Sequence, residues 1–128
     1  MKGKELKQAQ IFQVELDRVR PLTFDFNALC ELQEFYFDPF QAVAGLDAMN
    51  FKAMRAILYS SLVAGQMAED ETILFDLSVN QVGQILGSLM SDQEAFAGIF
   101  EKLAEAVQSF FPEPEVEEDE VKEEDEKN

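Results

Sequence analysis

Apolar and polar residues alternate near the start of the chain. Over residues 12–17, FQVELD, every second side chain is apolar, which is typical of a strand with one buried face. A second apolar segment, residues 19–24, follows an Asp-Arg step and contains Pro21, which favours an edge strand because proline has no amide hydrogen to donate. We therefore predict a β-hairpin over about residues 10–24. Because an isolated hairpin is only marginally stable, we expect it to lie on the helices.

Apolar residues recur at helical spacing in the next part of the chain. Asp25 is placed to cap a first helix. The Asp38-Pro39 step ends it, because the residue before a proline is disfavoured in helical conformation. A short helix over residues 39–46 should follow. The apolar positions of the first helix are Phe26, Leu29, Leu32 and either Phe35 or Tyr36.

Three further helices are expected between residues 50 and 111. Asn50 is a suitable cap for a long helix, which precedes an acidic linker at residues 67–76. Residues 78–81 and 91–94 both have the form of a capping box, and each box is expected to open another helix. The apolar stripe of the long helix consists of Phe51, Met54, Leu58, Leu62 and Gly65, and that of the next helix of Val79, Val82, Leu86, Leu89 and Met90.

The last predicted helix carries the candidate binding residues. Its apolar side chains recur every three or four residues and continue to the edge of a charged segment. One helix face cannot bury all of them unless a client helix or a second protomer covers its ends. The alternative is that most of them form the core, since burial of each large apolar side chain contributes about 1.5–3 kcal/mol. The predicted protein-binding residues are Phe96, Phe100, Leu103, Val107, Phe110 and Phe111.

Together these elements predict a mainly α fold, with one small helical domain over residues 1–111 and a short N-terminal β-hairpin. A length of 128 residues suffices for one such core. Of the 17 residues from 112 to 128, 12 are charged, which leaves too little apolar surface to bury. We therefore expect them to form a disordered acidic tail.

The charge balance limits the classes of partner. The net charge is −16: residues 1–111 hold 16 acidic and 8 basic residues, and residues 112–128 hold 10 acidic and 2 basic residues. Nucleic acid is disfavoured as a partner, because affinity for phosphates comes chiefly from Lys and Arg. An anionic membrane surface is disfavoured for the same reason, and no apolar run approaches the ~20 residues that a membrane span needs. The basic N-terminus also lacks the apolar segment of a secretory signal.

Candidate catalytic and metal-binding groups are sparse. The chain has no histidine, so Cys30 has no imidazole to activate it, and we expect a reduced thiol packed on an apolar helix face. Carboxylate pairs at helical spacing, such as Glu101 and Glu105, are expected to be solvated. The acidic run 69–71 and Asp76 lack the glycine-centred ligand spacing of an EF-hand loop. We therefore expect no enzyme activity, no cofactor and no metal site.

Three segments resemble the tail assembly chaperones of long-tailed bacteriophages and related prophages. The first is FDFNALCEL at residues 24–32, a short β segment that runs into a helix start. The second is RAILY at residues 55–59. The third is LSVNQVGQILG at residues 77–87, with Ser78 and Gln81 in the places of the family's Thr and Glu. The resemblance covers roughly residues 9–90.

The resemblance implies a function that needs no catalysis. Members of this family are small, mostly helical proteins that coat the tape-measure protein, a very long helical polypeptide, before the tail tube polymerises. The implied location is the host cell cytoplasm and not the mature virion. The implied partner is the tape-measure protein, with the tail-tube protein and a second copy of the chain as further candidates. Many members also have a longer form made by ribosomal frameshifting, and the residues Glu126-Lys127-Asn128 are compatible with codons that spell a slippery site.

One alternative belongs to another class of protein. An acidic inhibitor that mimics DNA would occupy a basic groove on its partner and would carry carboxylates in ordered rows on its folded body. Here half of the net charge lies in residues 112–128, and the other acidic residues are scattered along the chain. We therefore favour the chaperone.

Overall fold

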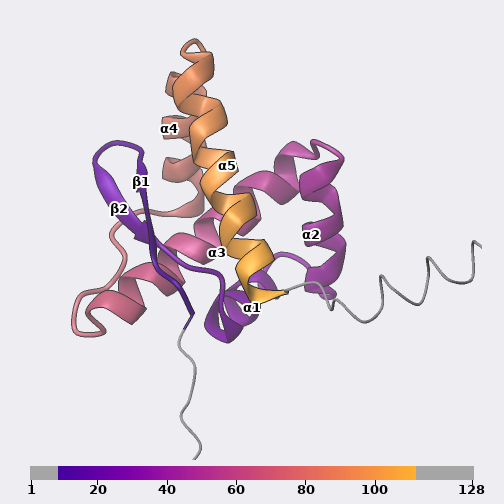
Figure 1. Ribbon diagram of the computed structural model, residues 1–128, viewed down its shortest axis with the longest axis vertical. Helices are drawn as coiled ribbons and strands as arrows, with labels where there is room; N and C mark the ends of the chain where they lie inside the picture. Colours follow the sequence, from indigo (N-terminus) through magenta and orange to yellow (C-terminus); the bar gives the residue numbers. More distant parts are fainter. Residues whose placement is uncertain (1–8, 112–128) are drawn as a thin grey trace, which may run out of the picture.

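The computed structural model describes residues 9–111 and confirms the predicted mainly α fold with an N-terminal hairpin (Figure 1). The elements in chain order are β1 (Phe12–Glu15), β2 (Val19–Leu22), α1 (Phe26–Leu32), α2 (Pro39–Asp47), α3 (Phe51–Glu69), α4 (Val79–Leu89) and α5 (Gln93–Phe110). The predicted disordered tail, residues 112–128, lies outside the described residues, as do residues 1–8.

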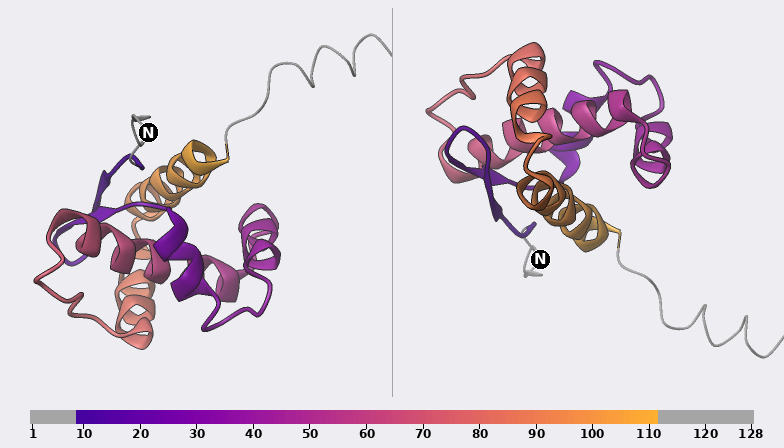
Figure 2. Two further views of the ribbon diagram at one scale, coloured as in Figure 1. Left: turned by 90° about the horizontal axis from the view of Figure 1, so that it is seen from below. Right: turned by 90° about the horizontal axis from the view of Figure 1, so that it is seen from above.

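The long helix α3 lies at the centre of the core. It contacts β2, α1, α2 and α4, while α5 contacts β1 and α4. Figure 2 shows the hairpin and α2 toward opposite ends of α3. The largest fully buried apolar side chains are Phe24, Leu22, Leu32, Ile57, Leu58, Leu62, Leu103 and Val82.

The hairpin is antiparallel, with Phe12 opposite Leu22 and Glu15 opposite Val19. Val14 and Leu22 are buried, whereas Glu15 is exposed, as expected for strands with one covered face. β2 packs against α3 and β1 packs against α5. The expectation that the hairpin lies on the helices is therefore confirmed.

Small residues on α3 let the end of β2 approach the helix backbone. Ser61 and Gly65 lie one turn apart on α3, and both are buried. The carbonyl of Ser61 accepts a hydrogen bond from the Thr23 amide at 3.1 Å. A Cβ atom at Gly65 would lie 2.5 Å from the carbonyl oxygen of Pro21, so only glycine fits this position without a shift of the backbone.

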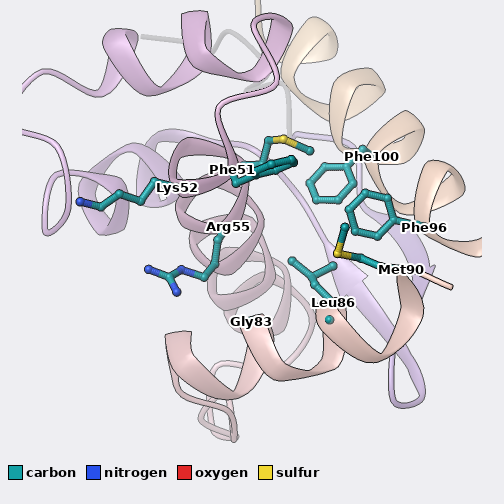
Figure 3. Close-up of a pocket in the computed structure, with 10 residues that line it drawn as sticks. Phe51, Lys52, Arg55, Gly83, Leu86, Met90, Phe96 and Phe100 are labelled. Carbon is teal, nitrogen blue, oxygen red and sulfur yellow. The ribbon is translucent and has the colours of Figure 1, made fainter. Parts of the chain in front are cut away.

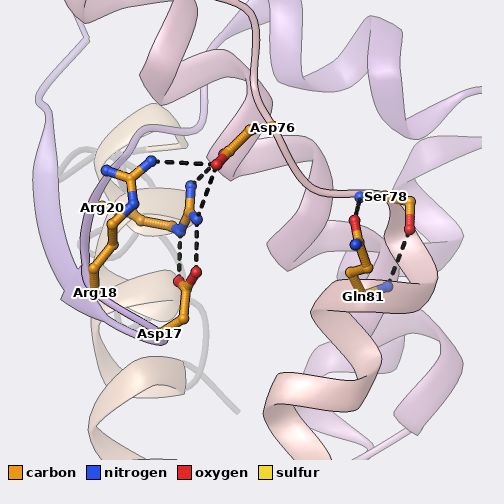
Figure 4. Close-up of polar contacts among 6 residues, drawn as sticks. All are labelled: Asp17, Arg18, Arg20, Asp76, Ser78 and Gln81. Carbon is orange, nitrogen blue, oxygen red and sulfur yellow. Dashed lines mark hydrogen bonds and ion pairs between the residues drawn. The ribbon is translucent and has the colours of Figure 1, made fainter.

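An ion cluster joins the hairpin to the loop between α3 and α4 (Figure 4). The side chain of Arg20 is 3% exposed and donates to both carboxylate oxygens of Asp17, at 2.7 and 2.8 Å, and to Asp76 at 2.7 Å. Arg18 adds a longer contact with Asp76 at 3.4 Å. The hydrogen bonds from Arg20 lower the pKa of Asp17 to about 2 and also lower the pKa of Asp76. Because a buried guanidinium needs paired carboxylates, the cluster holds the segment before α4 against the hairpin.

The predicted caps of three helices are confirmed. The carboxylate of Asp25 accepts from the backbone of α1, and the side chain of Asn50 does the same for α3. Ser78 and Gln81 form the reciprocal bonds of a capping box at the start of α4, with lengths of 3.1 and 2.8 Å (Figure 4). Each cap satisfies amide groups that have no partner within the helix.

Three boundaries differ from the predictions. The capping box predicted to begin at Ser91 is wrong, because α5 is capped by Asp92, whose carboxylate accepts from the Ala95 amide at 3.2 Å. The first helix is shorter than predicted and ends at Leu32, after which the chain forms hydrogen-bonded turns. The long helix continues to Glu69, so the acidic linker is shorter than predicted.

Some apolar residues of the predicted helix stripes are exposed. Phe26 and Phe51 are the first residues of α1 and α3, and they are 70% and 64% exposed. The buried face of α1 consists of Ala28 and Leu32. Cys30 lies off that face and is exposed, so the predicted packed thiol is wrong.

Candidate protein-binding groove

The six predicted binding residues of α5 do not share one surface. Leu103 and Val107 are 0% and 7% exposed and belong to the core, together with Ile99. Their side chains are therefore not available to a partner of the folded chain. The four phenylalanines form two pairs, one toward each end of α5.

The pair at the end of α5 packs against the α1–α2 side of the molecule. The ring of Phe110 meets that of Phe24 edge to face, with centroids 5.6 Å apart. The ring of Phe111 lies 5.8 Å from that of Phe40 on α2 and 4.8 Å from that of Phe110. Such edge-to-face pairs contribute to stability beyond their buried area, so this pair mainly anchors the helix end.

The pair near the start of α5 lines an apolar groove, which α3, α4 and α5 form together (Figure 3). The ring centroids of Phe96 and Phe100 lie 5.2 Å apart. The groove has a volume of about 400 Å³. It is lined by Phe51, Lys52, Met54, Arg55, Gly83, Leu86, Gly87, Met90, Phe96 and Phe100.

Large apolar side chains stand exposed at the edge of this groove. Phe51 on α3 is 64% exposed and Met90 after α4 is 55% exposed, whereas Met54 and Leu86 are buried. Exposed apolar side chains grouped around a hollow are typical of surfaces that bind another molecule. Of the sequence-predicted binding residues, Phe96 and Phe100 are the two that belong to this surface.

Two glycines keep the α4 side of the groove open. Gly83 and Gly87 lie one turn apart on α4. A Cβ atom at Gly87 would meet no atom within 4 Å, and one at Gly83 would lie 3.2 Å from Cδ of Arg55. A partner's backbone can therefore approach α4 closely at Gly87.

Two cations lie on the α3 side of the groove. Figure 3 shows the charged ends of Lys52 and Arg55 extending away from the aromatic rings of Phe96 and Phe100. Within residues 9–111 neither cation forms an ion pair with a described carboxylate. The lining contains no carboxylate, hydroxyl or thiol group. Its chemistry therefore suits binding through apolar contact and charge.

A second apolar hollow lies at α1 and the start of α2. It has a volume of about 490 Å³. Phe37, beside α2, is 94% exposed, and the exposed thiol of Cys30 also lies here. The lining residues are Phe26, Leu29, Cys30, Gln33, Phe37, Asp38, Pro39 and Phe40.

Sequence reasoning missed most of the groove, because it placed Phe51 and Met90 in the apolar stripes of their helices and did not identify them as exposed. Periodicity gives the residues of a helix face but not which neighbouring helix covers each turn. One signal was available: Phe51, Met90 and Phe96 all stand at the end of an apolar stripe.

Two carboxylates of the acidic linker are hydrogen-bonded to protein groups. Asp76 accepts from Arg20 of the hairpin, and the carboxylate of Asp70 accepts from the nearby Thr72 hydroxyl at 2.6 Å. Within residues 9–111 no three His, Cys, Asp or Glu side chains gather in a group that could hold a metal ion. Of the helices that the structure describes, none is both long and apolar enough to cross a membrane.

Comparisons with known proteins identified no relative. No protein-family model matches the chain, and searches of curated proteins and of solved structures gave no significant match. The resemblance to tail assembly chaperones therefore rests on the three segments quoted above. Two of these segments contribute to the groove, since Arg55 begins the second, and Gly83, Leu86 and Gly87 belong to the third.

Proposed function

We propose that this protein is a phage tail assembly chaperone that binds the tape-measure protein and keeps it soluble. It acts in the host cell cytoplasm during tail assembly and is not part of the mature virion. The observation that carries the proposal is the open apolar groove between α3, α4 and α5. Such a groove receives the apolar face of an amphipathic helix, and the long helical tape-measure protein presents such faces repeatedly.

The composition of the groove supports binding of many related segments. The thioethers of Met54 and Met90 repack easily around different side chains. The rings of Phe51, Phe96 and Phe100 offer large contact areas with few rotatable bonds. A groove of this kind accepts successive helices that differ in sequence, as a chaperone of one very long polypeptide requires.

The net charge of the chain supports the second part of the function. A net charge of −16 on 128 residues makes chaperone-coated segments repel one another, because like charges keep proteins apart in solution. The apolar surface of the client is then covered by the groove, and the outer surface of the complex is acidic. Both effects oppose aggregation of the client before assembly.

Co-expression with the tape-measure protein of the same genome tests this proposal. The soluble fraction of the tape-measure protein is measured with and without the tagged chaperone. We expect the client to become soluble and to co-purify. If it stays insoluble and nothing co-purifies with the wild-type protein, the proposal is wrong. The same assay with the tail-tube protein tests the second candidate partner, and light scattering of the purified chaperone tests association with a second copy.

A further inference from the structure

The groove differs in charge from the rest of the folded body. Residues 9–111 contain 15 acidic and 5 basic residues, yet the groove is lined by Lys52 and Arg55 and by no carboxylate. Of the other three cations in this part of the chain, two pair with carboxylates beside the hairpin. The fifth cation, Lys102, lies outside the groove. The groove therefore places two cations side by side on an acidic body, where an anionic partner finds opposite charge.

The cations and the aromatic rings lie on different sides of the groove. Lys52 and Arg55 are three residues apart on α3, which places them on one face of that helix. Figure 3 shows them on the α3 side, with the rings of Phe96 and Phe100 on the other side. A helix lying against the apolar rings therefore has the two cations at its outer edge, on the α3 side.

From this geometry we infer that the groove binds an amphipathic helix whose apolar stripe is bordered on one side by Asp or Glu. The inference rests on the proposed function and names the class of client segment. The client's apolar stripe covers Phe51, Met90 and Phe96. Carboxylates three or four residues apart on the client helix match the spacing of the two cations, so that charge fixes the orientation of the helix.

The acidic segment of the chain itself is a poorer match for the groove. Residues 113–128 contain 10 acidic residues, but their large apolar residues are only Val116 and Val121. Such a segment supplies charge to Lys52 and Arg55 and leaves most of the apolar lining uncovered. The preferred occupant therefore combines both features in one helix.

Three synthetic peptides test the inference on the full-length protein. Each is an amphipathic helix of about 18 residues, or five turns, with the same leucine stripe and with one flank made of Glu, Gln or Lys. Binding is measured by fluorescence anisotropy at low and at high salt. We expect the Glu peptide to bind about tenfold more tightly than the Lys peptide, since two ion pairs are replaced by two like-charge contacts. Salt should weaken this preference because the pairs are near the surface.

Two lysine variants provide a matched comparison. Lys52→Glu and Lys102→Glu both reverse one exposed cation on a helix and change the net charge equally, but Lys102 lies outside the groove. We expect Lys52→Glu to reduce the preference for the Glu peptide severalfold and Lys52→Glu/Arg55→Gln to abolish it. Lys102→Glu should keep the preference. Thermal unfolding shows whether each variant is folded. If the double variant does not fold, the single variant Lys52→Glu still tests the inference.

Several results would overturn the inference. The cations do not select the client if the three peptides bind equally or if none of them binds. The same conclusion follows if the folded double variant still prefers the Glu peptide. Tighter binding of the Glu peptide by about tenfold after removal of residues 113–128 would assign the groove to the chain's own acidic segment. Failure of the proposed function would give a different result. The tape-measure protein would then stay insoluble during co-expression, even if the protein binds the Glu peptide more tightly than the Lys peptide.

Discussion

The close approach of β2 to α3 gives a sharp test of the fold at Gly65. In Gly65→Ala, the new Cβ atom would lie 2.5 Å from the carbonyl oxygen of Pro21 and 2.6 Å from the amide nitrogen of Leu22. Both of these atoms belong to the backbone and cannot rotate away as a side chain does. Leu22 is fully buried, so relief of the clash requires the whole strand to shift against a packed core.

The size of the effect follows from two opposing contributions. Overpacking typically costs about 1–3 kcal/mol, and a clash with backbone should lie near the upper end of that range. Alanine gains about 1 kcal/mol over glycine in helix propensity. We therefore expect Gly65→Ala to reduce the free energy of unfolding by about 2 kcal/mol, a large part of the stability of a small domain.

Urea denaturation followed by circular dichroism measures this change, and Gly98→Ala is its matched control. Gly98 lies within α5, and a Cβ atom there would meet nothing within 4 Å. The control should therefore stabilise the protein by about 1 kcal/mol through propensity alone. We therefore expect the free energy of unfolding to fall in Gly65→Ala and to rise in Gly98→Ala. A Gly65→Ala protein as stable as the wild type would refute the packing of β2 on α3.

Further predictions concern the core, the groove and the ion cluster. Leu103→Ala should cost about 2–5 kcal/mol in urea denaturation, because the side chain is fully buried; a loss below 1 kcal/mol would place Leu103 outside the core. Phe100 is half-buried in the groove, so Phe100→Asp should leave the protein folded and abolish binding of the Glu-flanked peptide. A folded variant that binds this peptide normally would contradict the groove as the binding site. Because the folded-state pKa of Asp17 is lowered from 3.8 to about 2, its pairing with Arg20 stabilises the fold above pH 3.8. This contribution is lost as the pH falls to about 2, and it amounts to about 1 kcal/mol after allowance for solvent screening. The free energies of unfolding of the wild type and of Asp17→Asn, measured as the pH is lowered, should therefore converge near pH 2. A constant difference between the two proteins over this range would refute the role of the Asp17–Arg20 pair.

Local features of the fold could be predicted from the sequence because they depend on neighbouring residues. A cap such as Asn50 or Ser78 bonds to amides within three residues of itself, so its signal is contained in a short segment. The turn at the hairpin and the start of α2 at Pro39 are local in the same sense. By contrast, Arg20 also pairs with Asp76, 56 residues later in the chain, and no local pattern indicates that pairing.

The groove could be predicted only in part, for the same reason. The stripe of α5 identified Phe96 and Phe100 as residues that need a partner, but it also included Leu103, which the core buries. Which turns of a helix are covered depends on where α3 and α4 lie, and periodicity does not contain that information. The position of Lys52 beside these rings likewise depends on tertiary packing.

The most direct test of the groove as the client site is a comparison of Gly87→Phe with Gly98→Phe during co-expression with the tape-measure protein. Both glycines are within helices and have no atom within 4 Å of the added Cβ, and phenylalanine ranks above glycine as a helix former. The Gly87 variant places its ring in the groove, whereas the Gly98 variant does not. The account predicts that the tape-measure protein becomes insoluble with Gly87→Phe and stays soluble with Gly98→Phe. A tape-measure protein that co-purifies equally with both variants would contradict it.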